Sequence, residues 1–178
     1  MTYQTTTLLP MYTGYGAQAN EFPIVYDSLS RPIICWTETP RGLPFWSADS
    51  GVTISGISTN RGREITLDSG RSYYIWARPN FGASAANTSI EVGIYINGTN
   101  TLVGTKGRGQ TGQSLRLLTE IYGMTASAVI LPSDFSGSTL VLQVRFDTLS
   151  GTWNQNAQPV NDDTDAQGQG ELVIYSTP

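Results

Sequence analysis

Few side chains in this sequence could carry chemistry, and they are widely spaced. The chain has no histidine and a single cysteine, Cys35, so Ser-His-Asp and Cys-His catalysis and ordinary zinc sites are excluded. Paired carboxylates, as in glycosidases, would have to come from Glu64, Glu91, Glu120, Asp134 and Asp147. Their spacing places no two of them around one cleft, and acids alternating on a surface explain them better. The sequence therefore predicts no catalytic residues, and an enzyme is the least favoured function.

Binding chemistry is also sparse. The acidic run Asp162, Asp163 and Asp165 could supply oxygen ligands to calcium, but it lacks the twelve-residue loop with a terminal glutamate. A solvated loop is the favoured interpretation, so we predict no metal and no cofactor. Trp153 could stack on a sugar, although packing within its own loop is the commoner use of one aromatic ring. Cys35 lies in an apolar run typical of a core.

Composition narrows the range of partners. Only 13% of the 178 residues are charged, against about 25% in a typical soluble protein. The net charge of −4 and the scattered arginines argue against a nucleic-acid partner. Apolar runs are far shorter than the ~18 residues of a membrane span. The first residues form no signal peptide, so we expect synthesis in the cytoplasm and no membrane partner.

The strongest structural pattern is residues 90–105, IEVGIYINGTNTLVGT. Apolar residues alternate from Ile90 to Ile96, as on one face of a strand. Asn97-Gly98 follows, and the pair favours a type I′ hairpin turn. Shorter alternating segments at 52–55, 64–67, 71–78, 124–131, 139–146 and 171–175 predict further strands, with glycine-rich or polar loops at 106–113 and 147–170. No segment has a sustained helical period, so we predict an all-β, antiparallel jelly-roll sandwich.

Residues 1–50 differ from the rest. They hold five of the nine prolines together with many aromatic residues. Proline removes a ladder donor, which makes these residues poor central strands. We predict an extended N-terminal arm over 1–50 and a jelly-roll head domain over 51–178. The alternative is that 1–50 forms irregular edge strands of the same domain.

The order of segments from Ile65 to Tyr175 resembles the trimeric jelly roll of tumour necrosis factor and the complement globular heads. The resemblance is carried by a Leu-x-x-Gly turn before an aromatic strand (LDSGRSYYI), a strand ending in Asn-Gly (IEVGIYING), SAVILPSD, LVLQVRF and the closing GELVIY. It departs from the family at 134–137, where the corner is longer. The resemblance implies a homotrimer more firmly than any ligand.

Similar heads occur on bacteriophage particles, so the resemblance leads to a functional expectation. It is a structural virion protein, a capsid decoration or cement protein of a tailed bacteriophage, located on the capsid surface and bound to the major capsid protein or another virion scaffold. The arm would dock through Tyr3, Leu8, Leu9, Tyr12 and Tyr15. The alternative is a receptor-binding head of a tail fibre or spike that recognises a host glycan or protein through the loops at 106–113 and 147–170.

Overall fold

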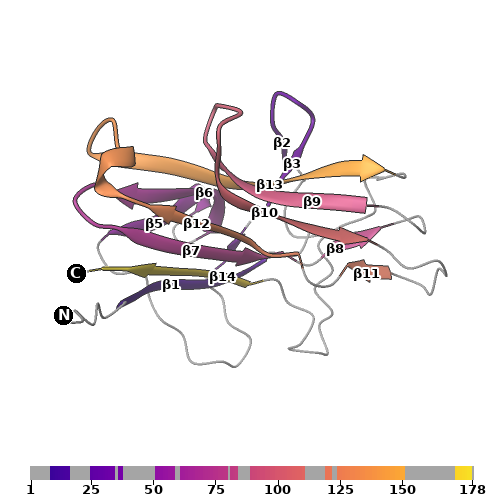
Figure 1. Ribbon diagram of the computed structural model, residues 1–178, viewed down its shortest axis with the longest axis horizontal. Helices are drawn as coiled ribbons and strands as arrows, with labels where there is room; N and C mark the ends of the chain where they lie inside the picture. Colours follow the sequence, from indigo (N-terminus) through magenta and orange to yellow (C-terminus); the bar gives the residue numbers. More distant parts are fainter. Residues whose placement is uncertain are drawn as a thin grey trace, which may run out of the picture.

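The computed structural model describes residues 9–16, 25–34, 36–37, 51–58, 61–79, 81–83, 89–110, 119–121, 124–150 and 171–177. Its strands are β1 Leu9–Gly16, β2 Val25–Tyr26, β3 Pro32–Ile33, β4 Trp36–Thr37, β5 Val52–Ser58, β6 Arg61–Asp68, β7 Tyr73–Arg78, β8 Phe81–Ala83, β9 Ser89–Ile96, β10 Leu102–Gln110, β11 Thr119–Ile121, β12 Ala126–Ile130, β13 Thr139–Ser150 and β14 Glu171–Ser176. One short 3-10 helix, η1 Pro132–Asp134, interrupts them. The predicted all-β fold is confirmed (Figure 1).

The strands form one curled antiparallel sheet in the order β2-β3-β13-β9-β10-β12-β7-β14-β1-β4-β6-β5. An additional pairing of β13 with β6 joins distant parts of this order. The sheet therefore folds back on itself and encloses its inner face, as in an all-β sandwich. A separate pair, β8 with β11, stands apart from the main sheet. Among the described residues, no helix has the length and apolarity needed to cross a membrane.

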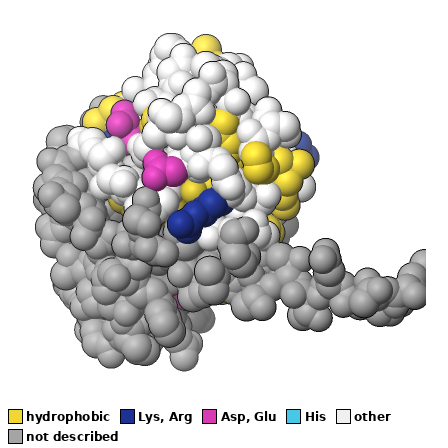
Figure 2. All heavy atoms as spheres, turned by 90° about the vertical axis from the view of Figure 1, so that its left-hand side faces the viewer, with side chains coloured by type: hydrophobic (Ala, Val, Ile, Leu, Met, Phe, Trp, Pro, Cys, Tyr) yellow, Lys and Arg dark blue, Asp and Glu magenta, His cyan; other side chains and the backbone are white. Residues whose placement is uncertain are grey.

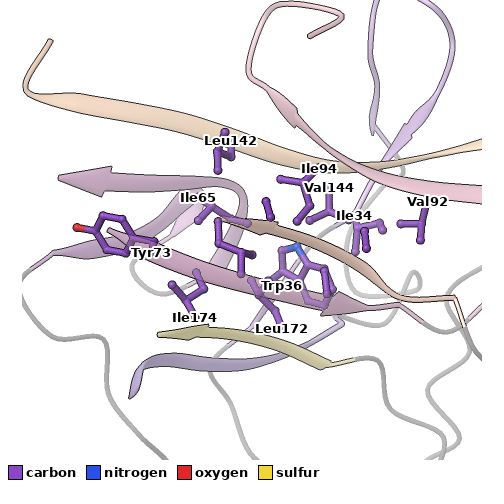
Figure 3. Close-up of a cluster of buried hydrophobic side chains, with 14 of the residues drawn as sticks. Ile34, Trp36, Ile65, Tyr73, Val92, Ile94, Leu142, Val144, Leu172 and Ile174 are labelled. Atoms are coloured by element: carbon purple, nitrogen blue, oxygen red, sulfur yellow. The ribbon is translucent and has the colours of Figure 1, made fainter. Parts of the chain in front are cut away.

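The core lies between the two sides of the curled sheet (Figure 3). It collects one alternating set of side chains from each strand: Tyr73, Ile75 and Ala77 of β7; Ile90, Val92 and Ile94 of β9; Leu142, Val144 and Phe146 of β13; and Leu172 and Ile174 of β14. Trp36 of β4 is fully buried among them. Side-chain alternation thus groups the residues that share the inner face.

The hairpin of β9 and β10 is confirmed, but the predicted type I′ turn is wrong. That turn needs positive φ at both central residues, and only Gly98, at +70°, has it. The Thr99 amide donates to the Ile96 carbonyl at 3.1 Å, and Leu102 is the first residue on the return to pair with Tyr95. The connection is therefore a five-residue loop, 97–101, that begins with a turn around Asn97-Gly98.

The loops predicted at 106–113 and 147–170 begin later than expected. Residues 106–110 belong to β10 and residues 147–150 to β13, and the structure does not describe 111–113 or 151–170. Both strands are longer because each pairs with β9 along most of its length. Pairing with a neighbour outweighs the weak strand propensity of glycine-rich sequence.

The expectation that residues 1–50 form no regular central strand is wrong. β1 lies between β14 and β4, and its register with β14 runs from Leu9↔Ser176 to Tyr15↔Glu171. A register irregularity between Pro10 and Tyr12 accommodates the proline. The short β2, β3 and β4 join the same sheet. These pairings favour the alternative of a shared domain, and the boundary at residue 50 stays a prediction.

Candidate functional site

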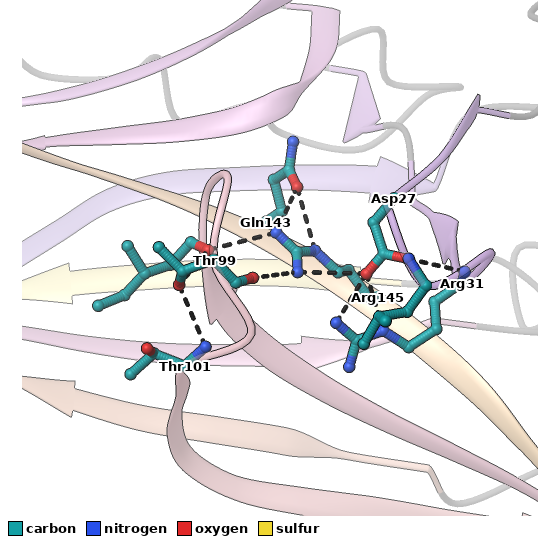
Figure 4. Close-up of polar contacts among 8 residues, drawn as sticks. Asp27, Arg31, Thr99, Thr101, Gln143 and Arg145 are labelled. Carbon is teal, nitrogen blue, oxygen red and sulfur yellow. Dashed lines mark hydrogen bonds and ion pairs between the residues drawn. The ribbon is translucent and has the colours of Figure 1, made fainter.

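Arg145 of β13 stands at the centre of a buried polar network. Its side chain projects from the outer face of the sheet yet is only 2% exposed. Nε and Nη2 donate to Gln143 Oε1 at 3.1 and 2.8 Å, and Nη1 donates to the Thr99 carbonyl at 2.7 Å. Nη2 also donates to the Ile96 carbonyl at 3.2 Å, and Nη1 to Asp27 Oδ2 at 3.3 Å (Figure 4). These contacts use the full donor capacity of the guanidinium group.

Asp27 connects this network to the turn between β2 and β3. Its Oδ1 accepts the backbone amides of Leu29 at 2.9 Å and Arg31 at 2.8 Å, an arrangement that fixes the turn. Its Oδ2 accepts Nε and Nη2 of Arg31, both at 2.7 Å. Burial alone would raise the pKa of Asp27, but the hydrogen bonds from Arg31 and Leu29 and the charge of Arg31 outweigh it and lower that pKa.

The ring of Tyr95 completes the network. The guanidinium carbon of Arg31 lies 4.4 Å from the ring centroid, and that of Arg145 lies 5.3 Å from it. Both distances are within the range of a cation–π contact. Burial lowers the pKa of Arg145, while the charge of Asp27 opposes that shift. Each charged group in the network pairs with other groups of the same chain. The network is therefore suited to holding together the β2–β3 turn, the β9–β10 loop and β13.

A second ion cluster lies on the same outer face. The Glu91 carboxylate, 8% exposed, accepts Lys106 Nζ at 2.6 Å and Arg108 Nε at 2.9 Å. The Lys106 hydrogen bond is the largest cause that lowers the pKa of Glu91, and the same bond raises the pKa of Lys106. A carboxylate held ionised by two cations cannot serve as a general acid near neutral pH.

The other carboxylates from the sequence analysis that the structure describes have separate partners. Glu64 accepts Asn97 Nδ2 at 3.1 Å, and Asp134 accepts the Leu131 amide at 2.8 Å. The register of β9 and β13 places exposed Asp147 opposite Glu91, a proximity that sequence spacing did not predict. The Glu120 side chain is outside the described residues. Among the residues that the structure describes, no three acidic or cysteine side chains could hold a metal ion.

Several predicted residues cannot be placed in full. Tyr3, Leu8, Cys35, Trp153 and the acidic run at 162–165 lie outside the described residues. Leu9, Tyr12 and Tyr15 lie in β1, whose backbone pairs with β14, and their side chains are not described. Docking through these residues stays a prediction, and it would have to leave the β1–β14 pairing intact.

A different outer face offers apolar side chains that sequence reasoning did not single out as a site. We call Tyr74 and Trp76 of β7, Val129 of β12, and Val173 and Tyr175 of β14 the aromatic face. The register places Val129, Tyr74 and Tyr175 in one row across the three strands, with Trp76 opposite Val173 in the next. The rings of Tyr74 and Tyr175 stack with centroids 6.5 Å apart.

Exposure distinguishes this face from the network of Arg145. Val129 is 60% exposed, and the four other members are partly exposed. Leu131, just beyond β12, is 47% exposed. Figure 2 views the end of the molecule near η1 and shows hydrophobic side chains gathered along one side of it. In the sequence, the aromatic face could have been recognised from the apolar residues that lie on both faces of β7 and β14.

At the far end of the aromatic face, Arg78 forms an ion pair with Glu171 at 3.5 Å, and its guanidinium carbon lies 5.7 Å from the Trp76 ring. Both charged side chains are 38% exposed, so this pair forms a polar margin beside the rings. The described site is thus an apolar strip with a charged border, which is the usual anatomy of a protein-binding surface. Comparison with protein-family models and with curated protein sequences finds no match to this chain.

Proposed function

We propose that this protein is a structural virion protein, a decoration protein that stabilises the capsid of a tailed bacteriophage as a homotrimer. The observation that carries the proposal is the aromatic face, an exposed apolar strip on the outside of a closed sheet. Apolar side chains that gather on a surface beside polar residues are a common feature of protein contact sites. A structural role also agrees with the two charged networks, in which the charged side chains pair with groups of the same chain.

The proposed occupant of the aromatic face is a second copy of this chain. The strip joins aromatic and aliphatic residues with a charged pair, Arg78 and Glu171, of which each member could pair with its opposite on a neighbouring copy. The proposed number of copies, three, comes from the resemblance to trimeric jelly-roll heads. The outer face of β13 is less suitable for such a contact because the β2–β3 turn already pairs with Arg145 there.

The virion assignment rests on the resemblance of the strand order and on a surface with few charges. The scaffold would be the major capsid protein. A density map of the particle that carries the protein tests this step. Copies at the local threefold positions of the capsid are expected, whereas copies confined to the tail tip would support the receptor-binding alternative.

The homotrimer itself can be tested on the isolated chain. Val129→Glu places a charge at the most exposed member of the aromatic face, and Leu29→Glu is a matched control because Leu29 is an aliphatic residue of similar exposure, 56%, on the β2–β3 turn. Sedimentation at micromolar concentration should give a trimer for the parent and for Leu29→Glu and a monomer for Val129→Glu, with unchanged thermal unfolding of the monomeric unit. A monomeric parent would exclude the trimer, and a trimeric Val129→Glu would place the contact elsewhere.

A further inference from the structure

The loop between β9 and β10 contains the only asparagine in the chain that is followed by glycine. Gly98 is exposed and has a φ of +70°, and a side chain built there would meet nothing within 4 Å. The peptide nitrogen that follows Asn97 is therefore not shielded by any side chain of its own residue. An asparagine side chain reacts most readily with the next backbone amide when that amide belongs to a glycine, which has no side chain to hinder the approach.

The contacts of Asn97 give such a reaction a structural consequence. Its Nδ2 donates to Glu64 Oε1 at 3.1 Å. The carbonyls on either side of Asn97-Gly98, those of Ile96 and Thr99, both accept hydrogen bonds from Arg145. Figure 4 shows this loop and the Asp27 turn meeting at Arg145. A change of charge or of backbone length at Asn97 therefore affects both the β9–β10 loop and the Asp27 turn.

We propose that Asn97 is a site of spontaneous deamidation and that its conversion loosens the contact between the β9–β10 loop and the β2–β3 hairpin. The backbone nitrogen of Gly98 attacks Cγ of Asn97, a carbon–nitrogen bond forms, and the Gly98 amide proton is released to water. The side-chain nitrogen takes up a proton from water and leaves as ammonia, which closes a succinimide ring. Water then adds to one of the two ring carbonyls and opens the ring.

Opening of the ring gives two products, and each disturbs a different contact. Aspartate at position 97 replaces the donor to Glu64 by a second carboxylate, and two carboxylates at hydrogen-bond distance repel each other. Isoaspartate carries an extra methylene group in the backbone between Ile96 and Thr99, so their carbonyls can no longer both meet Arg145. The hydrogen bond from Arg145 to Asp27 is weakened in the second case through the shared guanidinium group.

The rate is tested on the intact full-length chain stored in mildly alkaline buffer. Proteolysis followed by mass spectrometry measures the conversion of Asn97 to aspartate and isoaspartate. Asn100 is the internal reference, because it lies in the same exposed loop but precedes threonine. We expect Asn97 to convert faster than Asn100, with both product isomers present. Conversion of Asn97 no faster than that of Asn100 overturns the proposal.

The structural consequence is tested by hydrogen exchange at the Leu29 and Arg31 amides, which Asp27 holds. Aged parent protein should lose protection at both amides, and Asn97→Ser, which has no side-chain amide to lose, should keep its protection during the same storage. Asn97→Asp should strain the contact to Glu64, and Asn97→Asp with Glu64→Gln should restore its thermal midpoint. Unchanged protection in fully converted parent protein overturns the coupling between the two loops.

Discussion

The two outer faces of this curled sheet share one core but are completed in different ways. The face formed by β9, β10 and β13 carries charged residues, of which Arg145 pairs with Asp27 of the β2–β3 turn and Glu91 pairs with Lys106 and Arg108 of β10. Arg145 and Glu91 are both buried. The face formed by β7, β12 and β14 carries rings and aliphatic side chains that stay partly exposed. The charged groups of the first face are paired within the chain, whereas the second face has partly exposed apolar side chains available to a partner.

The charged face determines how segments of the chain fit together, whereas the aromatic face provides surface for assembly with a partner. A buried arginine whose donors are all used fixes the relative position of three segments, because any displacement leaves a charge unpaired. An apolar strip imposes no such geometry and gains free energy from any partner that removes it from water. Substitutions on the two faces should therefore change different measurements.

The largest effect is expected from Arg145→Ala. It leaves the carbonyls of Ile96 and Thr99 without this buried donor and removes one of the two arginines that pair with Asp27, and each buried acceptor left unsatisfied costs about 1–3 kcal/mol. Arg78→Ala is the control, since its ion pair at the edge of the aromatic face is exposed and is expected to contribute about 0–1 kcal/mol. Chemical denaturation measures both, and equal losses would remove the distinction between the faces.

Lowering the pH should reduce the stability contributed by the charged face before it affects the aromatic face. The pKa values of Asp27 and Glu91 lie below their ordinary values of 3.8 and 4.5, so each contributes stability that is present above those values. That stability is lost as the pH falls through the lowered pKa of the folded state. Denaturation midpoints measured from neutral pH downwards should fall in this acidic range. Asp27→Asn should flatten the slope, and an identical slope in the variant would contradict the assignment.

A smaller loss of monomer stability is expected on the aromatic face. Tyr175→Ala removes one partner of the stacked pair with Tyr74, and such pairs contribute about 0.5–1.5 kcal/mol beyond their buried area. The same substitution should weaken self-association, which sedimentation measures at several protein concentrations. Loss of stability without any change in association would show that the rings serve only their own sheet.

The smallest effect should come from Arg108→Ala. The arginine side chain is 71% exposed, although it reaches the buried Glu91 carboxylate at 2.9 Å. Solvent screens an exposed partner, and Lys106 still pairs with Glu91 after the substitution. We expect a loss of about 0.2–1 kcal/mol in denaturation experiments. Lys106→Met is the comparison, and it should cost more because Lys106 makes the shorter contact.

Sequence periodicity was a reliable guide where a strand and its inner face are determined locally. The alternation through Tyr73, Ile75 and Ala77 needs no knowledge of distant segments, and all three lie together in the core. The network of Arg145 could not be found in this way, because Asp27 lies 118 residues earlier in the chain. Arg145 was correctly assigned to the outer face, but its burial depends on the β2–β3 hairpin.

Proline content misled the interpretation of the first 50 residues. Pro10 and Pro32 do lack ladder donors, but each occupies a position that tolerates it. Pro10 lies at a register irregularity of β1, and Pro32 begins the two-residue strand β3. Composition thus described the irregularity of these strands correctly and said nothing about where in the sheet they would lie.

The position of β14 also governs when the sheet can be completed during synthesis. Among the described strands β14 comes last in the sequence, yet it lies between β1, which comes first, and β7. Until residues 171–176 have been made, β1 and β7 each keep one edge without its final partner. A nascent chain that stops earlier would expose two unpaired edges, which are templates for aggregation. The barrel-like sheet can therefore close only after residues 171–176 have been made, long after β1 and β7 have left the ribosome.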